Sequence, residues 1–167
     1  NIDYKDTKTT LATFQKIKKQ GFSGVEIATA FLPKEHHTTV QSILKDLELK
    51  VVTQIHTTGY PVIETDPARN FDDFRIKVEQ ALDWNPLLIN SHSGRDDWDI
   101  ETSKEFFRKV TSYEASLGNS VNISHETHRQ RTLCTHTTTF QIMKSVPDLH
   151  YTLDLSHWVL SAERLIS

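Results

Sequence analysis

Apolar positions along the chain follow two alternating periods. In some segments they recur every three or four residues, as on one face of an amphipathic helix. Between these segments lie short, nearly continuous apolar runs, which are typical of parallel strands covered on both faces of a sheet. The pattern predicts strands at 24–27, 50–56, 87–92, 121–126 and 149–154, and helices near 11–20, 40–47, 67–82, 100–117, 140–146 and 159–166.

Local sequence signals support these boundaries. Gly21 and Gly118 each follow a helical pattern, where a left-handed residue commonly ends a helix. Asp66 followed by Pro67 is typical of a helix start, because proline is well tolerated in the first turn. The predicted organisation is therefore a row of strand–helix units.

Polar residues recur at the predicted strand ends with the spacing of such units. Their separations are 30, 36, 34 and 28 residues, for Glu26, His56, His92, Glu126 and Asp154. A βα unit needs about 30 residues or more. In a β/α barrel all strand carboxyl ends point at one opening, which accounts for a polar residue on each. A doubly wound sheet shares the rhythm but usually carries a glycine-rich loop after its first strand, and this sequence lacks one.

We therefore predict an α/β fold, a (β/α)8 TIM barrel that is incomplete. The 167 residues form a single partial domain of about five βα units. A complete barrel has eight units in about 250 residues. We expect the first strand and the last two strands to be missing, which leaves open barrel edges and invites self-association.

Composition limits the classes of binding partner that we expect for this chain. The formal net charge is -3, so the composition gives no electrostatic signal that favours nucleic acid as a partner. No apolar run reaches the ~18 residues of a membrane span, so we expect no membrane partner. Cys134 is the only cysteine, which favours a reducing cytoplasmic location.

Glu126 and Asp154 are the leading candidates for metal binding. Carboxylates at the ends of adjacent buried strands suit Mg, Mn or Zn, and neighbouring imidazoles shift the preference toward Mn, Co or Zn. The alternative for each carboxylate is an ion pair or a cap on the next helix.

Further polar residues surround these two acids. His157 is expected to contact a substrate hydroxyl or a metal, or else to be a capping histidine. His56, His92 and His128 are expected to line a substrate pocket, although a histidine at a strand end can also belong to the core. Arg129 is expected to hold a substrate oxygen or to pair with a carboxylate. Strand alternation turns His125 away from the barrel interior, which predicts a structural role.

The runs HETHR at 125–129 and DLSHW at 154–158 resemble the xylose-isomerase-like TIM-barrel superfamily. This group holds sugar isomerases, sugar-phosphate isomerases and epimerases, and an endonuclease that cuts at abasic sites. The resemblance covers the whole chain as units two to six of eight. It implies that Glu126 and Asp154 bind a divalent metal and that His157 binds substrate or a second metal. The family completes its site with a histidine on strand seven and an acid on strand eight, so we expect weak metal binding and little activity from this chain alone.

The leading functional hypothesis is a divalent-metal-dependent sugar or sugar-phosphate isomerase or epimerase that acts through an enediolate on a small sugar-like substrate. The candidate proton-transfer group is Glu126 or the family's acid on strand eight, and His157 and Arg129 are the candidates to hold substrate oxygens. One alternative is a metal-dependent phosphodiesterase like the abasic-site endonucleases, with imidazoles from His56, His92 and His157 at a multi-metal site. Another is a non-catalytic barrel fragment that binds a partner.

Overall fold

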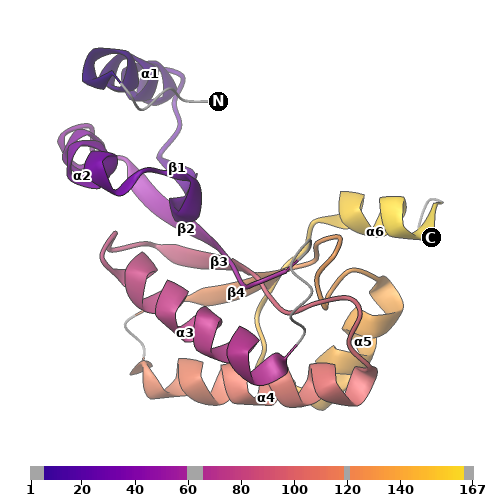
Figure 1. Ribbon diagram of the computed structural model, residues 1–167. Coiled ribbons are helices and arrows are strands. Elements are labelled where there is room, and N and C mark those ends of the chain that lie inside the picture. Colours follow the sequence, from indigo (N-terminus) through magenta and orange to yellow (C-terminus); the bar gives the residue numbers. More distant parts are fainter. Residues whose placement is uncertain (1–5, 60–65, 119–120, 164–167) are drawn as a thin grey trace.

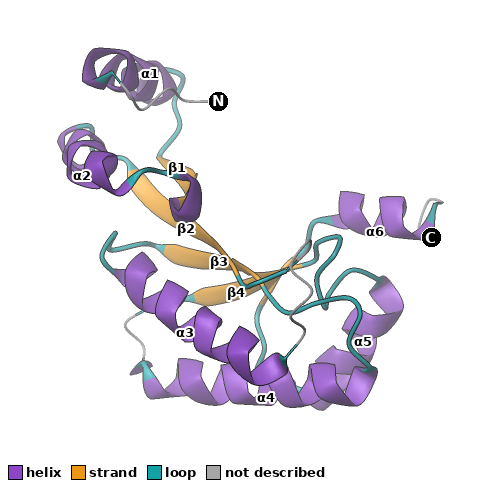
Figure 2. Ribbon diagram, in the orientation of Figure 1, coloured by secondary structure: helices purple, strands orange, loops and turns teal. Residues whose placement is uncertain are grey.

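The structure is a computed structural model that describes residues 6–59, 66–118 and 121–163. Strands and helices alternate along the chain (Figures 1 and 2). The elements in chain order are α1 (Thr7–Lys19), β1 (Gly24–Ala28), η1 (Thr29–Phe31), η2 (Lys34–His36), α2 (His37–Asp46), β2 (Lys50–His56), α3 (Pro67–Leu82), β3 (Leu88–His92), α4 (Ile100–Ser116), β4 (Ile123–Glu126), α5 (His136–Ser145), β5 (Tyr151–Thr152) and α6 (Leu155–Ala162).

The five strands form one parallel sheet in the order β1-β2-β3-β4-β5. Each strand pairs with the next one along the chain, without the reversal of order that defines a doubly wound sheet. In Figure 1, α3, α4 and α5 lie on the same side of the strands. This is the winding of a β/α barrel, so the predicted fold class is confirmed.

The side of the sheet that faces the helices carries the larger core. Phe74 and Val78 of α3 and Phe107 and Val110 of α4 are completely buried against apolar strand residues such as Ile89. Burying each such side chain contributes about 1.5–3 kcal/mol relative to leaving it exposed. The packing fixes the strands and leaves their other face to polar side chains.

Helix ends agree with the sequence signals. Asp66 caps α3 by accepting a hydrogen bond from the Ala68 N–H at 2.9 Å, and Pro67 occupies the first turn. Gly21 and Gly118 follow α1 and α4 with φ of +90° and +68°, a left-handed backbone that only glycine adopts without strain. No helix within the described ranges has the length and apolar character to cross a bilayer.

The last strand is much shorter than predicted. β5 contains only Tyr151–Thr152, because Asp154 leaves the sheet and caps α6. The Thr127 hydroxyl accepts a hydrogen bond from the Asp154 N–H at 2.8 Å and donates one to the Asp154 carbonyl at 3.0 Å. The backbone of Asp154 is therefore bonded to a side chain instead of to the backbone of a neighbouring strand. Consequently α6 starts at Leu155, four residues before the predicted helix start. Residues 164–166 of that predicted helix lie outside the described residues.

Glu26 also differs from the prediction of a strand end. It lies in the middle of β1, which continues to Ala28. By contrast, His56, His92 and Glu126 are the final residues of β2, β3 and β4, as predicted.

Candidate metal centre

Four imidazole rings form a row along the carboxyl ends of the strands. His56 ends β2 and is the register partner of His92 at the end of β3. The centroids of these two rings are 4.3 Å apart, with 24° between the planes. His128, in the loop after β4, lies 4.4 Å from His92, and His157, in the first turn of α6, lies 3.9 Å from His128. Residues as far as 101 positions apart in the sequence, His56 and His157, therefore lie at one edge of the sheet.

Glu126 is the anionic centre of this edge. Its Oε2 atom accepts a hydrogen bond from Asn90 Nδ2 at 2.5 Å and lies 2.9 Å from His92 Nε2. The same Asn90 amide donates to Glu26 Oε1 at 3.0 Å. Asn90 thus links carboxylates from β1 and β4 across the polar face of the sheet.

Sequence reasoning missed Asn90, although the sequence contained a signal for it. Asn90 precedes His92 by two positions in β3, and residues two apart in a strand point to the same face. Gln54 and His56 show the same relationship in β2, and the Gln54 Oε1 atom lies 3.0 Å from His56 Nε2.

The surroundings of Glu126 keep it ionised. Only 9% of the residue is exposed, and this burial opposes the charge. The hydrogen bond from His92, the charge of that ring and the Asn90 amide outweigh burial and hold the pKa of Glu126 below its ordinary value. A carboxylate that stays anionic is suited to binding a cation and poorly suited to accepting a proton.

Asp154 makes both contacts that were the alternatives to metal binding, a cap on the next helix and an ion pair. Its Oδ1 atom caps α6 by accepting from the Ser156 N–H at 2.9 Å and from the Ser156 hydroxyl at 2.5 Å. Its Oδ2 atom lies 3.7 Å from His157 Nε2. The Ser156 hydrogen bond is the main cause that lowers the pKa of Asp154, so this carboxylate is also anionic at neutral pH.

Two of the histidines are held in the neutral form. Burial, assisted by the neighbouring charges of His92 and Arg131, lowers the pKa of His56 to about 4. Burial also lowers the pKa of His128. A neutral imidazole has a free nitrogen lone pair, which is the form that binds metals.

These donors fit a divalent cation. Two overlapping sets each bring their ligand atoms within 4.8 Å of one another: His92, Glu126 and His128, and Glu126, Asp154 and His157. Within the described part of the chain, the Nδ1 atoms of His92 and His157 are buried without a hydrogen-bond partner. Mixed imidazole and carboxylate donors suit Zn, Co and Mn better than they suit Mg.

The predicted arginine stands apart from this arrangement. Arg129 is exposed, and among the described residues it makes no ion pair within 4.0 Å. Arg131, which the sequence analysis did not single out, is turned inward instead: its Nη1 atom donates to the Thr57 carbonyl at 2.6 Å, beside Gly59. A loop without periodicity gave no signal that distinguished the two arginines.

His125 has the structural role that strand alternation predicted. It is completely buried on the helix side of the sheet. Its Nδ1 atom lies 2.7 Å from the Ser93 hydroxyl, and its Nε2 atom lies 2.8 Å from Glu114 Oε1 of α4. This link attaches α4 to the strands that end in His92 and Glu126.

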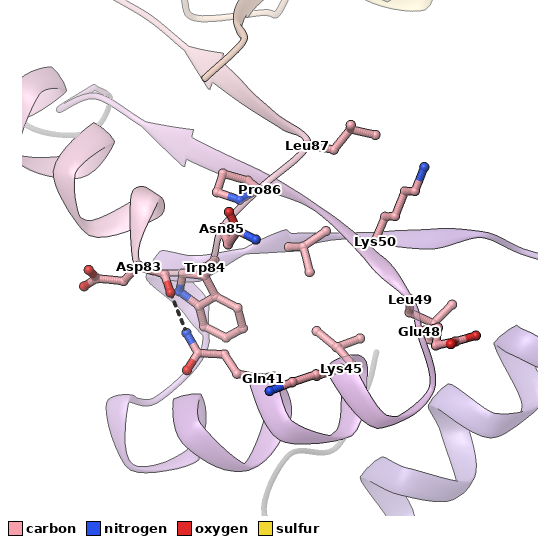
Figure 3. A pocket seen from close by; sticks show the side chains of 12 residues that line it. Gln41, Lys45, Glu48, Leu49, Lys50, Asp83, Trp84, Asn85, Pro86 and Leu87 are labelled. Carbon is pink, nitrogen blue, oxygen red and sulfur yellow. Dashed lines mark hydrogen bonds between the residues drawn. The ribbon is translucent and has the colours of Figure 1, made fainter. Parts of the chain in front are cut away.

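A hollow of about 730 Å³ lies at the opposite end of the strands. Figure 3 shows Trp84 within it and the hydrogen bond from Gln41 to Asp83 at its rim. Lys50 and Leu87, at the amino ends of β2 and β3, also line it. Barrel active sites lie at the carboxyl ends of the strands, so we assign this hollow no catalytic role.

Comparison with solved structures gives similar folds at low sequence identity. The probable 3-DHS dehydratase AsbF from Bacillus anthracis is 20% identical with a TM-score of 0.64, and the match covers 90% of this chain and 59% of that chain. D-Psicose 3-epimerase from Clostridium cellulolyticum H10, solved with D-tagatose, is 17% identical with a TM-score of 0.61, over 88% of this chain and 58% of that chain. A xylose isomerase-like TIM barrel protein from Mycobacterium smegmatis, solved with magnesium, is 15% identical with a TM-score of 0.57. This match covers 91% of this chain and 58% of that chain.

No family model matches the sequence, and no curated protein matches it. The chain spans less than two thirds of the length of the solved structures named above. The resemblance seen in the sequence is therefore confirmed at the level of the fold: the chain has the fold of xylose-isomerase-like TIM barrels, over about five βα units.

Proposed function

We propose that this chain carries part of the active site of a divalent-metal-dependent isomerase or epimerase that acts on a small sugar or sugar phosphate. The observation that supports this most strongly is the buried, ionised Glu126, which belongs to both candidate ligand sets at the carboxyl ends of the strands. The magnesium-bound neighbour and the epimerase neighbour support the same assignment.

The reaction class is removal of a proton from the carbon beside a carbonyl, which proceeds through an enediolate. Glu126 and Asp154 would hold the divalent cation, which would supply a Lewis acid for the substrate carbonyl. Loss of water from a β-hydroxy carbonyl compound can begin with the same proton removal, and one structural neighbour is a probable dehydratase.

In this proposal the imidazole side chains contact the substrate and move its proton. Glu126 is held ionised and acts as a ligand, so the proton is moved by His157, whose Nε2 faces Asp154 at 3.7 Å. The rings of His56, His92 and His128 line the path of the substrate, and the exposed Arg129 reaches an oxygen or phosphate at its far end. We place the protein in the cytoplasm, where Cys134 stays reduced.

Hydrogen–deuterium exchange tests this proposal without requiring a complete turnover. The polypeptide is incubated with Mn²⁺ and ketoses such as D-tagatose and D-psicose in D₂O, and the C–H signals beside the carbonyl are followed by proton NMR. We expect slow exchange that stops when the metal is removed and in Glu126→Gln, but continues in the control Glu105→Gln, whose side chain is exposed. A Mn²⁺-loaded protein that exchanges no ketose proton would contradict the proposal.

A further inference from the structure

His128 differs from the other histidines of the row in the state of its ring nitrogens. Its Nδ1 atom lies 2.7 Å from the backbone carbonyl of Arg129. A carbonyl oxygen only accepts hydrogen bonds, so Nδ1 carries the proton and Nε2 keeps its lone pair. Histidines that bind metals usually donate the second ring N–H to a carbonyl or carboxylate, which fixes the ring in this way.

The lone pair of His128 belongs to a compact set of donors. His128 follows Glu126 by two positions, and its ring packs at 4.4 Å on the ring of His92. The ligand atoms of His92, Glu126 and His128 all lie within 4.8 Å of one another, so an ion between them could contact all three after small side-chain shifts.

The protein around this set holds two of its members in place. His92 and Glu126 are buried, with 3% and 9% of their surfaces exposed. The ring of His56 stacks on the far side of His92, and the Asn90 amide holds Glu126. A bound cation would replace the present hydrogen bond between His92 and Glu126, so little rearrangement is needed for binding.

We propose that His92, Glu126 and His128 form a binding site for a late divalent transition-metal ion such as Zn²⁺ or Co²⁺. Two imidazoles and one carboxylate leave a fourth position open to water or substrate, which is the ligand number of catalytic zinc sites. This set is separate from Asp154 and His157, which together with Glu126 form the oxygen-richer set that is closer to the preference of Mn²⁺ or Mg²⁺.

The site goes beyond the proposed function because the chain completes it with its own residues. The sequence alone predicted weak metal binding, because the family resemblance places two further ligands on strands seven and eight and leaves Glu126, Asp154 and His157 as the donors of this chain. With His128 as a ligand, three donors are present on β3, β4 and the loop that follows β4. Binding of Zn²⁺ or Co²⁺ here does not depend on whether the chain isomerises a sugar.

Titration of the metal-free chain with Co²⁺, followed by visible absorption, tests this site. We expect one equivalent to produce the intense ligand-field bands of a four-coordinate ion, Zn²⁺ to abolish them stoichiometrically, and excess Mg²⁺ to leave them unchanged. His128→Gln should weaken Co²⁺ binding by at least about tenfold, since even indirect partners of metal ligands contribute that much. The matched control His150→Gln, at an exposed position, should bind as the unmodified chain does.

Two results would overturn the proposal. One is the absence of ligand-field bands in the unmodified chain, a measurement that does not depend on how any variant folds. The other is that Asp154→Asn abolishes binding while His128→Gln, shown by circular dichroism to be folded, preserves it. The Co²⁺ titration measures metal binding alone, so its result does not change if the sugar-exchange assay fails. Likewise, the absence of a Co²⁺ site does not change the result of the exchange assay with Mn²⁺.

Discussion

The Nε2 atom of His92 lies 2.9 Å from Oε2 of Glu126, and both side chains are buried at the ends of neighbouring strands. Asn90 donates to the same carboxylate oxygen at 2.5 Å. A buried carboxylate is costly unless hydrogen bonds compensate for the lost water. The stability of this edge of the sheet therefore depends on a few donors.

Replacing Asn90 with leucine should destabilise the fold. Asn90→Leu removes a donor from Glu126 and Glu26 and leaves a buried charge with one partner fewer. We expect a loss of about 1–3 kcal/mol in the free energy of unfolding, measured by urea denaturation at pH 7. The control Asn122→Leu, whose exposed side chain makes one long hydrogen bond of 3.4 Å, should change stability by no more than about 0.5 kcal/mol. Equal effects at the two positions would contradict this account of Asn90.

The stability of the protein should depend on pH through His56. Burial first, and then the charge of His92, lower its pKa from 6.5 to about 4. Between these values the unfolded chain binds a proton that the folded chain does not, so stability falls as the pH falls through this window. One proton corresponds to at most about 1.4 kcal/mol per pH unit, and the partial exposure of His56 reduces this figure.

Urea unfolding at several pH values between 7.5 and 4.5 measures this effect. His56→Gln should reduce the slope in that window, because glutamine does not titrate, and the slope that remains includes His128, whose pKa is also lowered by burial. His150→Gln, at an exposed position, should leave the slope unchanged. The same slope in His56→Gln and in the unmodified chain would show that His56 titrates normally in the folded state.

Glu114 should stabilise the attachment of α4 to the sheet. Its carboxylate is the partner of His125 Nε2 at 2.8 Å, and the histidine ring is completely buried. Glu114→Ala leaves that nitrogen unsatisfied, and we expect a loss of about 1–3 kcal/mol in unfolding free energy by urea denaturation. Glu105→Ala, on the same helix but 57% exposed, serves as the control with an expected change within about 0.5 kcal/mol. No difference between the two variants would argue against the link.

The open edge at β5 and α6 should promote self-association. Leu153, Leu155 and Leu160 are each more than half exposed there. Apolar surface beside an unpaired strand favours contact with another chain. We expect the apparent mass in size-exclusion chromatography with light scattering to rise with concentration, and the rise to disappear in Leu155→Lys/Leu160→Lys. The control variant Leu87→Lys changes a leucine that is exposed elsewhere in the fold, so this variant should still associate. An unmodified chain that stays monomeric as its concentration rises would refute the prediction.

Much of the fold was predictable because the sequence carries two clear periods. The runs at 50–56 and 87–92 are rich in apolar and β-branched residues, and they became β2 and β3 within one residue of the predicted bounds. The run at 149–154 has a similar appearance but forms only the two-residue strand β5. There the Asp154 carboxylate accepts a capping hydrogen bond from the Ser156 N–H, and the Asp154 backbone contacts the Thr127 side chain. Both interactions compete with strand pairing, and hydropathy does not report either of them.

The sequence predicted which strand ends form the candidate site, but it did not predict the hydrogen bonds that connect their side chains. Spacing alone placed His56, His92 and Glu126 at one edge of the sheet, where the structure brings them together. The bridging amide of Asn90 depends on two carboxylates from β1 and β4, a relation between distant strands that a single strand pattern does not show. The tautomer of His128 depends on a loop carbonyl, which has no sequence signature.

The central claim is that the carboxyl ends of β3 and β4 form a metal centre around Glu126. Crystals of the chain grown with Zn²⁺ and measured on both sides of the zinc absorption edge test it directly. The account predicts an anomalous peak about 2.0–2.2 Å from a Glu126 carboxylate oxygen and from Nε2 of His92 and His128. A peak found only at exposed histidines such as His150, with none beside Glu126, would contradict it.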